Sequence, residues 1–197
     1  STVLAVPGRR LDVSNVTRIA WSGHLLLAVS NGALFARDHL RPYIPPYTFT
    51  FPSRVVDVSG NLFSFCATLL DGSVACRGRY ISDVTPWEFS EGPRRVNGLS
   101  DVASTAVGLG FYCALKRDGT VWCWGDNAFG QTGTPIAMAE RCFQRREDGA
   151  NPVEVYASCV RQPRQVAGLA NVVEVRAGLT WACARLRDGS VWCWGYN

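Results

Sequence analysis

The sequence of 197 residues lacks several features that would identify a class of protein at once. It contains one methionine and two histidines, and no hydrophobic run approaches the roughly 18 residues that a membrane-spanning helix requires. No signal peptide is visible, and there is no lysine-rich run or basic helical stretch. The formal net charge of +4 comes mostly from scattered arginines, a distribution that argues against nucleic-acid binding.

Groups that could carry catalysis are also scarce. His24 and His39 are not accompanied by a recognisable serine elbow or by paired carboxylates. Glu147 and Asp148 are adjacent to each other, but they lie in a charged loop, where solvated side chains are usual. Close Cys-x-x-Cys knuckles, which zinc sites commonly use, do not occur. We therefore expect no catalytic residue, no metal and no cofactor, and we expect that the protein is not an enzyme.

The sequence does contain one repeated unit, which is present in four copies. Three copies have a central Asp-Gly flanked by cysteines, and a fourth copy without cysteines has Asn-Gly in the same place. With 47% of its residues hydrophobic and 18% charged, the chain has enough apolar material for one domain with a core. The copies are LLAVSNGALFARD at 26–38, CATLLDGSVACRG at 66–78, CALKRDGTVWCWG at 113–125 and CARLRDGSVWCWG at 183–195.

Each copy is typical of a β-hairpin. Asp-Gly and Asn-Gly turn a chain at low cost because glycine takes positive φ without strain, and apolar residues flank each turn. A three-residue loop at 117–119, with Gly119 in the left-handed conformation, places Cys113 directly opposite Cys123. Opposed residues of antiparallel strands have Cα atoms about 4.5–5.5 Å apart, which is within reach of a disulfide.

The eight cysteines are therefore expected to form disulfides, with free thiols and zinc as the alternatives. Three pairs follow from the repeated spacing, and the two remaining cysteines are left for each other. Disulfides persist in oxidising compartments, which predicts an extracellular, periplasmic or cell-surface location. Because the chain begins with serine, we expect a mature or excised segment. The predicted pairs are Cys66–Cys76, Cys113–Cys123, Cys183–Cys193 and Cys142–Cys159.

Both faces of the predicted hairpin are apolar. Leu115 and Val121 share the face of the cysteines, whereas Trp122 and Trp124 lie on the opposite face. A strand pair with two apolar faces needs cover on both sides, which face-to-face stacking of sheets provides. Because the turns recur roughly every 40 to 50 residues and each repeat supplies about four short strands, the pattern predicts the blades of a β-propeller.

Residues 134–162 interrupt the repeat pattern as an insertion stapled at its base by Cys142 and Cys159. Long insertions on regular scaffolds often carry binding function, although this one could equally cover the edge of a sheet or a neighbouring blade. A second loop offers two further aromatic side chains as candidate interface anchors. The candidate binding residues are Arg141, Phe143, Arg145, Arg146, Glu147, Asp148 and Tyr156 in the insertion, with Trp87 and Phe89 in the second loop.

The segment CALKRDGTVWCWGDNAFGQTG at 113–133 resembles the repeat of the regulator of chromosome condensation family, AL-xx-DG-x-V-x-x-WG-x-N-xx-GQLG, with Thr132 where leucine is usual. The cysteine-bearing form is similar to a secreted bacterial branch labelled alpha-tubulin-suppressor-like and to the ectodomain repeats of crinkly-type plant receptor kinases. The resemblance implies an all-β fold, a β-propeller that usually has seven blades. Four repeats are recognisable, at about 7–44, 45–92, 93–162 and 163–197.

Four repeats are fewer than seven blades, so we expect part of a larger or associated propeller whose open blade faces are covered by a protein partner or a homo-oligomer. The function expected from the resemblance is a non-enzymatic extracytoplasmic protein–protein interaction module, which can belong to a cell-surface assembly. It would bind its partner through propeller loops and the insertion. A carbohydrate-binding, lectin-like propeller is the alternative, and an enzyme or an enzyme inhibitor is less favoured.

Overall fold

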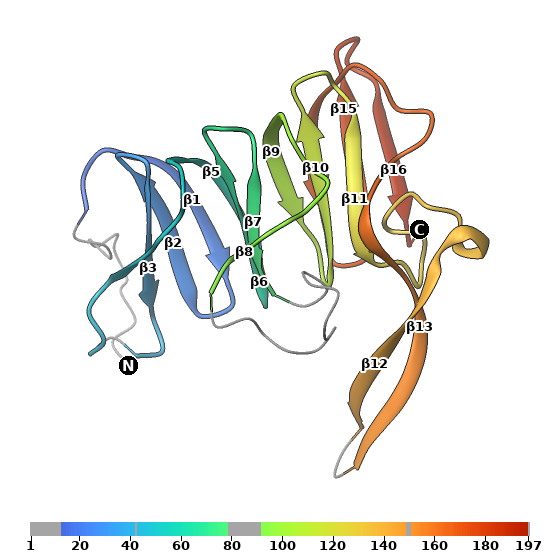
Figure 1. Ribbon diagram of the computed structural model, residues 1–197, viewed down its shortest axis with the longest axis horizontal. Helices are drawn as coiled ribbons and strands as arrows, with labels where there is room; N and C mark the ends of the chain where they lie inside the picture. The colour runs from blue at the N-terminus through green and yellow to red at the C-terminus, as the bar shows by residue number, and fades with distance from the viewer. Residues whose placement is uncertain (1–12, 42, 79–91, 149–150, 197) are drawn as a thin grey trace, which may run out of the picture.

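The computed structural model describes residues 13–41, 43–78, 92–148 and 151–196, and the side chains of 143–155 lie outside the described set. Four antiparallel sheets follow one another along the chain and stack side by side, as Figure 1 shows. Only one short 3₁₀ helix, Ile136–Met138, interrupts the strands of the described ranges. This is the blade arrangement of a β-propeller, which the sequence predicted.

The four sheets, called blades 1 to 4 below, take their strands in chain order, except that blade 3 gains an extra hairpin at its edge. Blade 1 has the order β1-β2-β3-β4, blade 2 β5-β6-β7-β8, blade 3 β12-β13-β11-β10-β9 and blade 4 β14-β15-β16. Within the described residues blade 4 alone has three strands. The bounds are β1 Val16–Ser22, β2 Leu25–Ser30, β3 Ala33–Asp38, β4 Tyr47–Phe49, β5 Val55–Asn61, β6 Ser64–Leu69, β7 Val74–Arg77, β8 Arg94–Arg95, β9 Val102–Val107, β10 Phe111–Lys116, β11 Val121–Asp126, β12 Glu140–Asp148, β13 Asn151–Gln165, β14 Val172–Ala177, β15 Trp181–Leu186 and β16 Val191–Gly195.

The central hairpin of blade 3 has the predicted register. Cys113 pairs with Cys123, and Leu115 with Val121, while Gly119 has a φ of 81° as the three-residue loop requires. Blades 2 and 4 repeat this register, and the structure contains the disulfides Cys66–Cys76, Cys113–Cys123, Cys183–Cys193 and Cys142–Cys159.

The hairpin of blade 1 is tighter than the others. Ser30 pairs with Ala33, so only two residues form the loop, and Asn31 and Gly32 have φ of 51° and 82°. Two consecutive positive φ values define the turn type that Asn-Gly favours in two-residue hairpins. The missing third loop residue distinguishes this copy from the three Asp-Gly copies.

The aspartate of each Asp-Gly turn orders its loop. The Oδ1 atom of Asp118 accepts hydrogen bonds from the backbone N–H of Thr120 at 2.9 Å and from its hydroxyl at 2.6 Å. Asp71 with Ser73, and Asp188 with Ser190, make the same pair of bonds. These bonds stabilise the charged carboxylate and hold the pKa of all three aspartates below the usual value of 3.8.

A depressed pKa in the folded state means that the turns stabilise the fold above the unfolded pKa, and that this stabilisation is lost as the pH falls through the folded pKa. We predict that the melting temperature falls between pH 5 and pH 3 partly because these carboxylates become protonated. The triple variant Asp71→Asn, Asp118→Asn, Asp188→Asn keeps the Oδ1 acceptors without the charge. Thermal melts across this pH range should show a smaller fall for the variant, and an equal fall would contradict the prediction.

The stacking of the blades covers both faces of the blade 3 hairpin, as the sequence predicted. Cys113, Leu115 and Val121 pack with residues of blade 4, including Val175 and Ala184. The opposite face carries Tyr112, Ala114 and Trp124, which pack with residues of blade 2 around its own disulfide. The core is therefore a series of layers between blades. None of the described segments forms a helix with the length and hydropathy of a membrane span.

Candidate functional site

The insertion forms a long hairpin, β12–β13, that leaves the stack of blades (Figure 1). Nine residue pairs join its strands, from Glu140 opposite Cys159 to Asp148 opposite Asn151. Residues 160–165 of β13 run on along β11 and form the outer strand of blade 3. We call residues 140–159 the hairpin arm. Because the arm extends away from the sheets, its outer part does not serve as cover for a neighbouring blade.

The base of the arm is fixed to the blade by covalent and polar contacts. The disulfide between Cys142 and Cys159 is buried. The carboxylate of Glu140 lies 3.2 Å from Nε of Arg161 and 3.5 Å from Nη2 of Arg164, and Arg164 also donates to the Met138 carbonyl at 3.0 Å. These contacts hold the start of β12 against β13, so the arm emerges in a defined direction.

The predicted binding residues of the insertion all lie on the arm. Arg141 is exposed, and Tyr156 has 64% of its surface exposed. Phe143 pairs with Tyr156 in the backbone register. The remaining four, Arg145, Arg146, Glu147 and Asp148, occupy the last part of β12, where only the backbone is described. Trp87 and Phe89 lie outside the described residues.

Sequence reasoning missed the residues that fix the arm. Glu140, Arg161 and Arg164 flank the two cysteines in the sequence, and their opposite charges could have suggested an ion-pair cluster at the stapled base. Their partners become visible only once the strands are paired.

We expect that the variant Cys142→Ala, Cys159→Ala loosens the arm without unfolding the blades. A disulfide that closes a loop of this length stabilises by roughly 3 kcal/mol on the chain-entropy model. Amide exchange of residues 140–160 should therefore become faster by about a hundredfold, while exchange in β10 and β15 stays unchanged. Equal loss of protection across blade 3 would show that the disulfide stabilises the blade itself.

The loop that follows β11 is a joint between blades 3 and 4. The side chains of Asn127, Gln131 and Thr132 have no exposed surface. The Oδ1 atom of Asn127 accepts from the Thr132 hydroxyl at 2.6 Å, and the Gln131 carbonyl accepts from the indole N–H of Trp194 in blade 4 at 3.0 Å. These residues therefore connect two blades.

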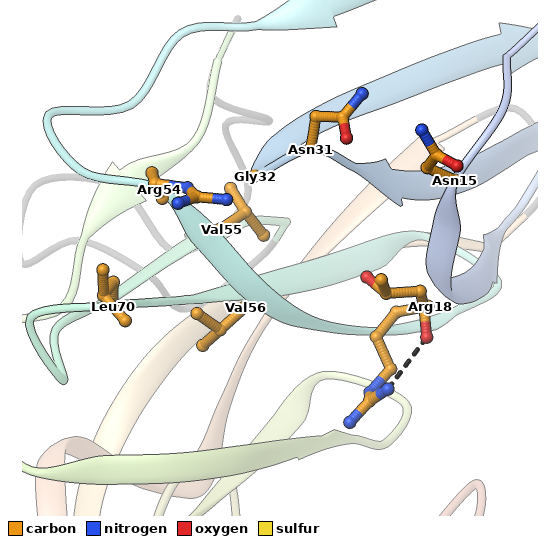
Figure 2. Close-up of a pocket in the computed structure, with 9 residues that line it drawn as sticks. Asn15, Arg18, Asn31, Gly32, Arg54, Val55, Val56 and Leu70 are labelled. Atoms are coloured by element: carbon orange, nitrogen blue, oxygen red, sulfur yellow. Dashed lines mark hydrogen bonds between the residues drawn. The ribbon is translucent and has the colours of Figure 1, made fainter.

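A cleft of about 470 Å³ lies between blades 1 and 2, near the turn of the first hairpin. The Arg18 guanidinium lies at one side of it (Figure 2), with Nη1 donating to the Thr17 carbonyl at 2.8 Å and Nε 3.3 Å from Asp57. Burial raises the pKa of the Asp57 carboxyl despite this partner. The Arg18 cation is thus paired with a residue of blade 2, and this ion pair joins the two blades at the cleft. Its lining is Asn15, Thr17, Arg18, Asn31, Gly32, Arg54, Val55, Val56 and Leu70.

A second hollow, of about 630 Å³, holds both histidines at the opposite end of blades 1 and 2. Nε2 of His24 lies 3.3 Å from the buried carboxylate of Asp38, whose other oxygen accepts the backbone N–H groups of Leu40 and Arg41. The Nδ1 atom of His39 lies 2.6 Å from the carbonyl oxygen of His24. These bonds order the loop after β3. Across the described ranges no group of three or more His, Cys, Asp or Glu side chains could hold a metal ion.

Comparison with known proteins supports the predicted repeat and the predicted fold. Residues 102–131 match the family model of the regulator of chromosome condensation (RCC1) repeat. The probable E3 ubiquitin-protein ligase HERC4 of Rattus norvegicus is 27% identical over 111 residues, which cover 53% of this chain and 8% of that protein. The chain thus spans less than a tenth of this curated relative.

Among solved structures, yeast RCC1 (Prp20) in its complex with Kap60 matches 95% of this chain with a TM-score of 0.73 at 19% identity, and the match spans 45% of that chain. Prp20p from Saccharomyces cerevisiae, solved in a study of its binding to Gsp1p and histones, gives a TM-score of 0.66 over 91% of this chain and 44% of its own. Human WBSCR16 matches with a TM-score of 0.54. Residues 102–131 therefore match the repeat of the regulator of chromosome condensation family, and the chain has the β-propeller fold of these solved structures.

Proposed function

We propose that this protein is a non-enzymatic extracytoplasmic module that binds another protein through the hairpin arm and adjacent propeller loops. The observation that carries the proposal is the arm itself, a hairpin that leaves the blade stack and is stapled at its base. Its two strands are held in register, so side chains on it are presented with little loss of entropy on binding.

The exposed residues of the arm have the character of protein-binding surfaces. Tyr156 presents a large amphipathic ring, and the exposed Arg141, which lies opposite Ser158 in the strand register, presents a guanidinium group. Tyrosine and arginine are enriched among residues that dominate binding energy at interfaces. The outer edge of β12 also has no neighbouring strand in the described sheet, which leaves backbone groups open to pair with a partner.

Protein binding is also what the matched yeast structures display. Prp20 was solved with Kap60 and studied for binding to Gsp1p and histones. Those partners belong to the yeast protein, of which this chain spans less than half. For this chain they support protein recognition as the class of function and name no partner.

The extracytoplasmic part of the proposal rests on the disulfides. All eight cysteines are joined in four pairs, and three of these pairs repeat at equivalent positions of successive hairpins. Such bonds form and persist in oxidising compartments. A protein that depends on them for stability would be expected to work outside the cytoplasm.

The test is the affinity for a native partner isolated by crosslinking through residue 156. The variants Arg141→Glu and Tyr156→Ala should weaken binding by about tenfold or more, because they remove exposed contacts without touching the core. Matched controls are Arg187→Glu and Tyr43→Ala, which change exposed residues of the same types in other blades. Unchanged affinity in both arm variants, or an equal loss in the controls, would overturn the proposal.

Carbohydrate binding is the second candidate, and exposed indole rings favour it. Trp21, Trp181 and Trp192 each present about half of their surface, and exposed aromatic faces can stack on apolar surfaces of a ligand. A glycan array would test this role directly. Binding that is lost in the Trp192→Ala variant and retained in Tyr156→Ala would favour the carbohydrate role over protein recognition by the arm.

A further inference from the structure

A glycosylation sequon, Asn15-Val16-Thr17, lies where blade 1 begins. It is the only Asn-x-Ser/Thr triplet of the sequence, and the proposed binding function does not use it. Such a triplet, with any residue except proline in the middle, is the acceptor for N-linked glycans, which are bulky and need a surface position. A match this short is frequent by chance, so the place of the triplet in the fold decides what it indicates.

The acceptor asparagine is exposed and its side chain is not used by the fold. Asn15 directly precedes β1, with a φ of 54°. It lines the cleft of about 470 Å³ described above, so open space lies beside it, and Figure 2 shows its carboxamide apart from the other labelled side chains. Within the described ranges this carboxamide makes no hydrogen bond. The amide nitrogen is therefore free to carry a substituent.

The repeat shows that this position stays exposed when another blade packs before it. Asp101 and Asn171 occupy the same position before β9 and β14, with φ of 57° and 56°. Each packs its backbone on the turn glycine of the preceding blade, Gly72 or Gly119. Even so, Asn171 is exposed and the side chain of Asp101 is 75% exposed. The side chain of Asn15 is therefore expected to face solvent in a closed propeller as well.

The hydroxyl position of the sequon is exposed in the same way. Thr17 lies at the surface, and its hydroxyl makes one long contact of 3.4 Å to a carbonyl of β2. Its equivalents in blades 3 and 4, Ala103 and Val173, are also exposed. The middle residue is the one that a preceding blade covers, since Val102 and Val172 are buried. Both residues that the modification needs thus lie outside the layers between blades.

The sequon lies at the end of the blades that is remote from the hairpin arm. Val16 pairs with Ser30, next to the turn of the first hairpin. The arm leaves blade 3 at the other end of β11, where Asp126 pairs with Cys159. Figure 1 shows the hairpin turns and the arm at opposite ends of the stack. A glycan on Asn15 would therefore leave the arm free to contact a partner.

We propose that Asn15 carries an N-linked oligosaccharide. A bond forms between Nδ2 of Asn15 and the anomeric carbon of a lipid-linked oligosaccharide, while the bond from that carbon to the lipid diphosphate breaks. The diphosphate leaves with the electron pair, and the amide proton passes to a base of the transferase. The Thr17 hydroxyl marks this asparagine as an acceptor. The inference rests on the proposed extracytoplasmic location, because secreted proteins receive such glycans in the compartment that also forms disulfides.

The first test uses the protein from its natural source. The tryptic peptide 11–18 should be heavier by roughly 1 kDa or more, and a peptide N-glycanase acting in water labelled with oxygen-18 should leave aspartate at position 15 with a gain of about 3 Da. Disulfide mapping of the same digest separates two failures. Unmodified Asn15 beside intact disulfides would overturn the glycan and leave the extracytoplasmic location standing. Free thiols would overturn the location itself.

A pair of exchanged residues tests the position itself. Thr17→Val gives blade 1 the Asn-Val-Val sequence of blade 4, and Val173→Thr gives blade 4 the sequon of blade 1. When eukaryotic cells secrete the chain behind a cleavable leader, Thr17→Val should lose the glycan and Val173→Thr should gain a second one on Asn171. Both changed residues are exposed, so both variants should fold and be secreted. A glycan that persists in Thr17→Val, or an unmodified Asn171 in secreted Val173→Thr, would contradict the inference.

Discussion

Replacement of both Cys113 and Cys123 by alanine is expected to lower the free energy of unfolding by about 4 kcal/mol. About 3 kcal/mol of this is the loop entropy that a short disulfide-closed loop removes from the unfolded chain. The remainder is packing, because both cysteines are fully buried between blades 3 and 4. Equilibrium urea unfolding followed by tryptophan fluorescence measures the loss.

The matched control is the repeat-equivalent pair in blade 4. The variant Cys183→Ala, Cys193→Ala opens a loop of the same length, but Cys193 is exposed and its partner is half-buried. It should therefore cost only the entropic part, about 3 kcal/mol. Equal losses in the two variants would show that the layer between blades 3 and 4 does not depend on the disulfide packing.

The variant Trp124→Ala should cost about 3–5 kcal/mol, the loss typical of a large aromatic side chain removed from a core. Trp124 is 1% exposed and stacks on Tyr112 with ring centroids 5.4 Å apart, in the layer between blades 2 and 3. Because both blades contribute to this layer, the cavity would weaken the joint between them. The same unfolding measurement reports the loss.

Trp192→Ala is the control for this prediction. Trp192 belongs to the same repeated motif but is 56% exposed, so its removal should cost less than about 1 kcal/mol. A small loss in both variants would contradict the layered core described above. A large loss in both would mean that the exposed ring of Trp192 is covered in solution.

The sequence predicted those parts of the fold that depend on neighbours in the chain. The Asp-Gly turn at Gly119 determines which residues face each other, and this alone placed Cys113 beside Cys123 and separated the two apolar faces. The apolar faces then required stacked sheets. Turn chemistry and alternation are local signals, which explains why these predictions were confirmed.

Features that depend on distant contacts were harder to predict. Blades 1 to 3 each take their outer strand from the segment that begins the next repeat, so the sheets do not coincide with the repeats in the sequence. The direction of the arm follows from how β13 continues along β11 and from the Glu140 ion pairs. Trp192 is 56% exposed while its repeat equivalent Trp122 is half-buried, and the shared motif gives no sign of this difference.

The candidate binding residues of the insertion lie together on the arm, but the sequence did not predict how the arm is arranged. Charged and aromatic residues in an insertion indicate exposure, and Arg141 and Tyr156 are exposed. Nothing in the insertion sequence distinguishes a loop folded over a blade from a hairpin that extends away from it. That difference decides whether the aromatic rings are available to a partner.

The central claim is that disulfide-joined hairpins organise this propeller and suit it to an oxidising compartment. The most direct measurement is the intact mass of the native protein before and after reduction, with peptide mapping of the linked cysteines. We predict a gain of about 8 Da, two hydrogens for each of the four bridges, and linked peptides for the pairs 66–76, 113–123, 142–159 and 183–193. Free thiols in the native protein, or cysteines linked between different hairpins, would contradict the claim and the proposed extracytoplasmic role.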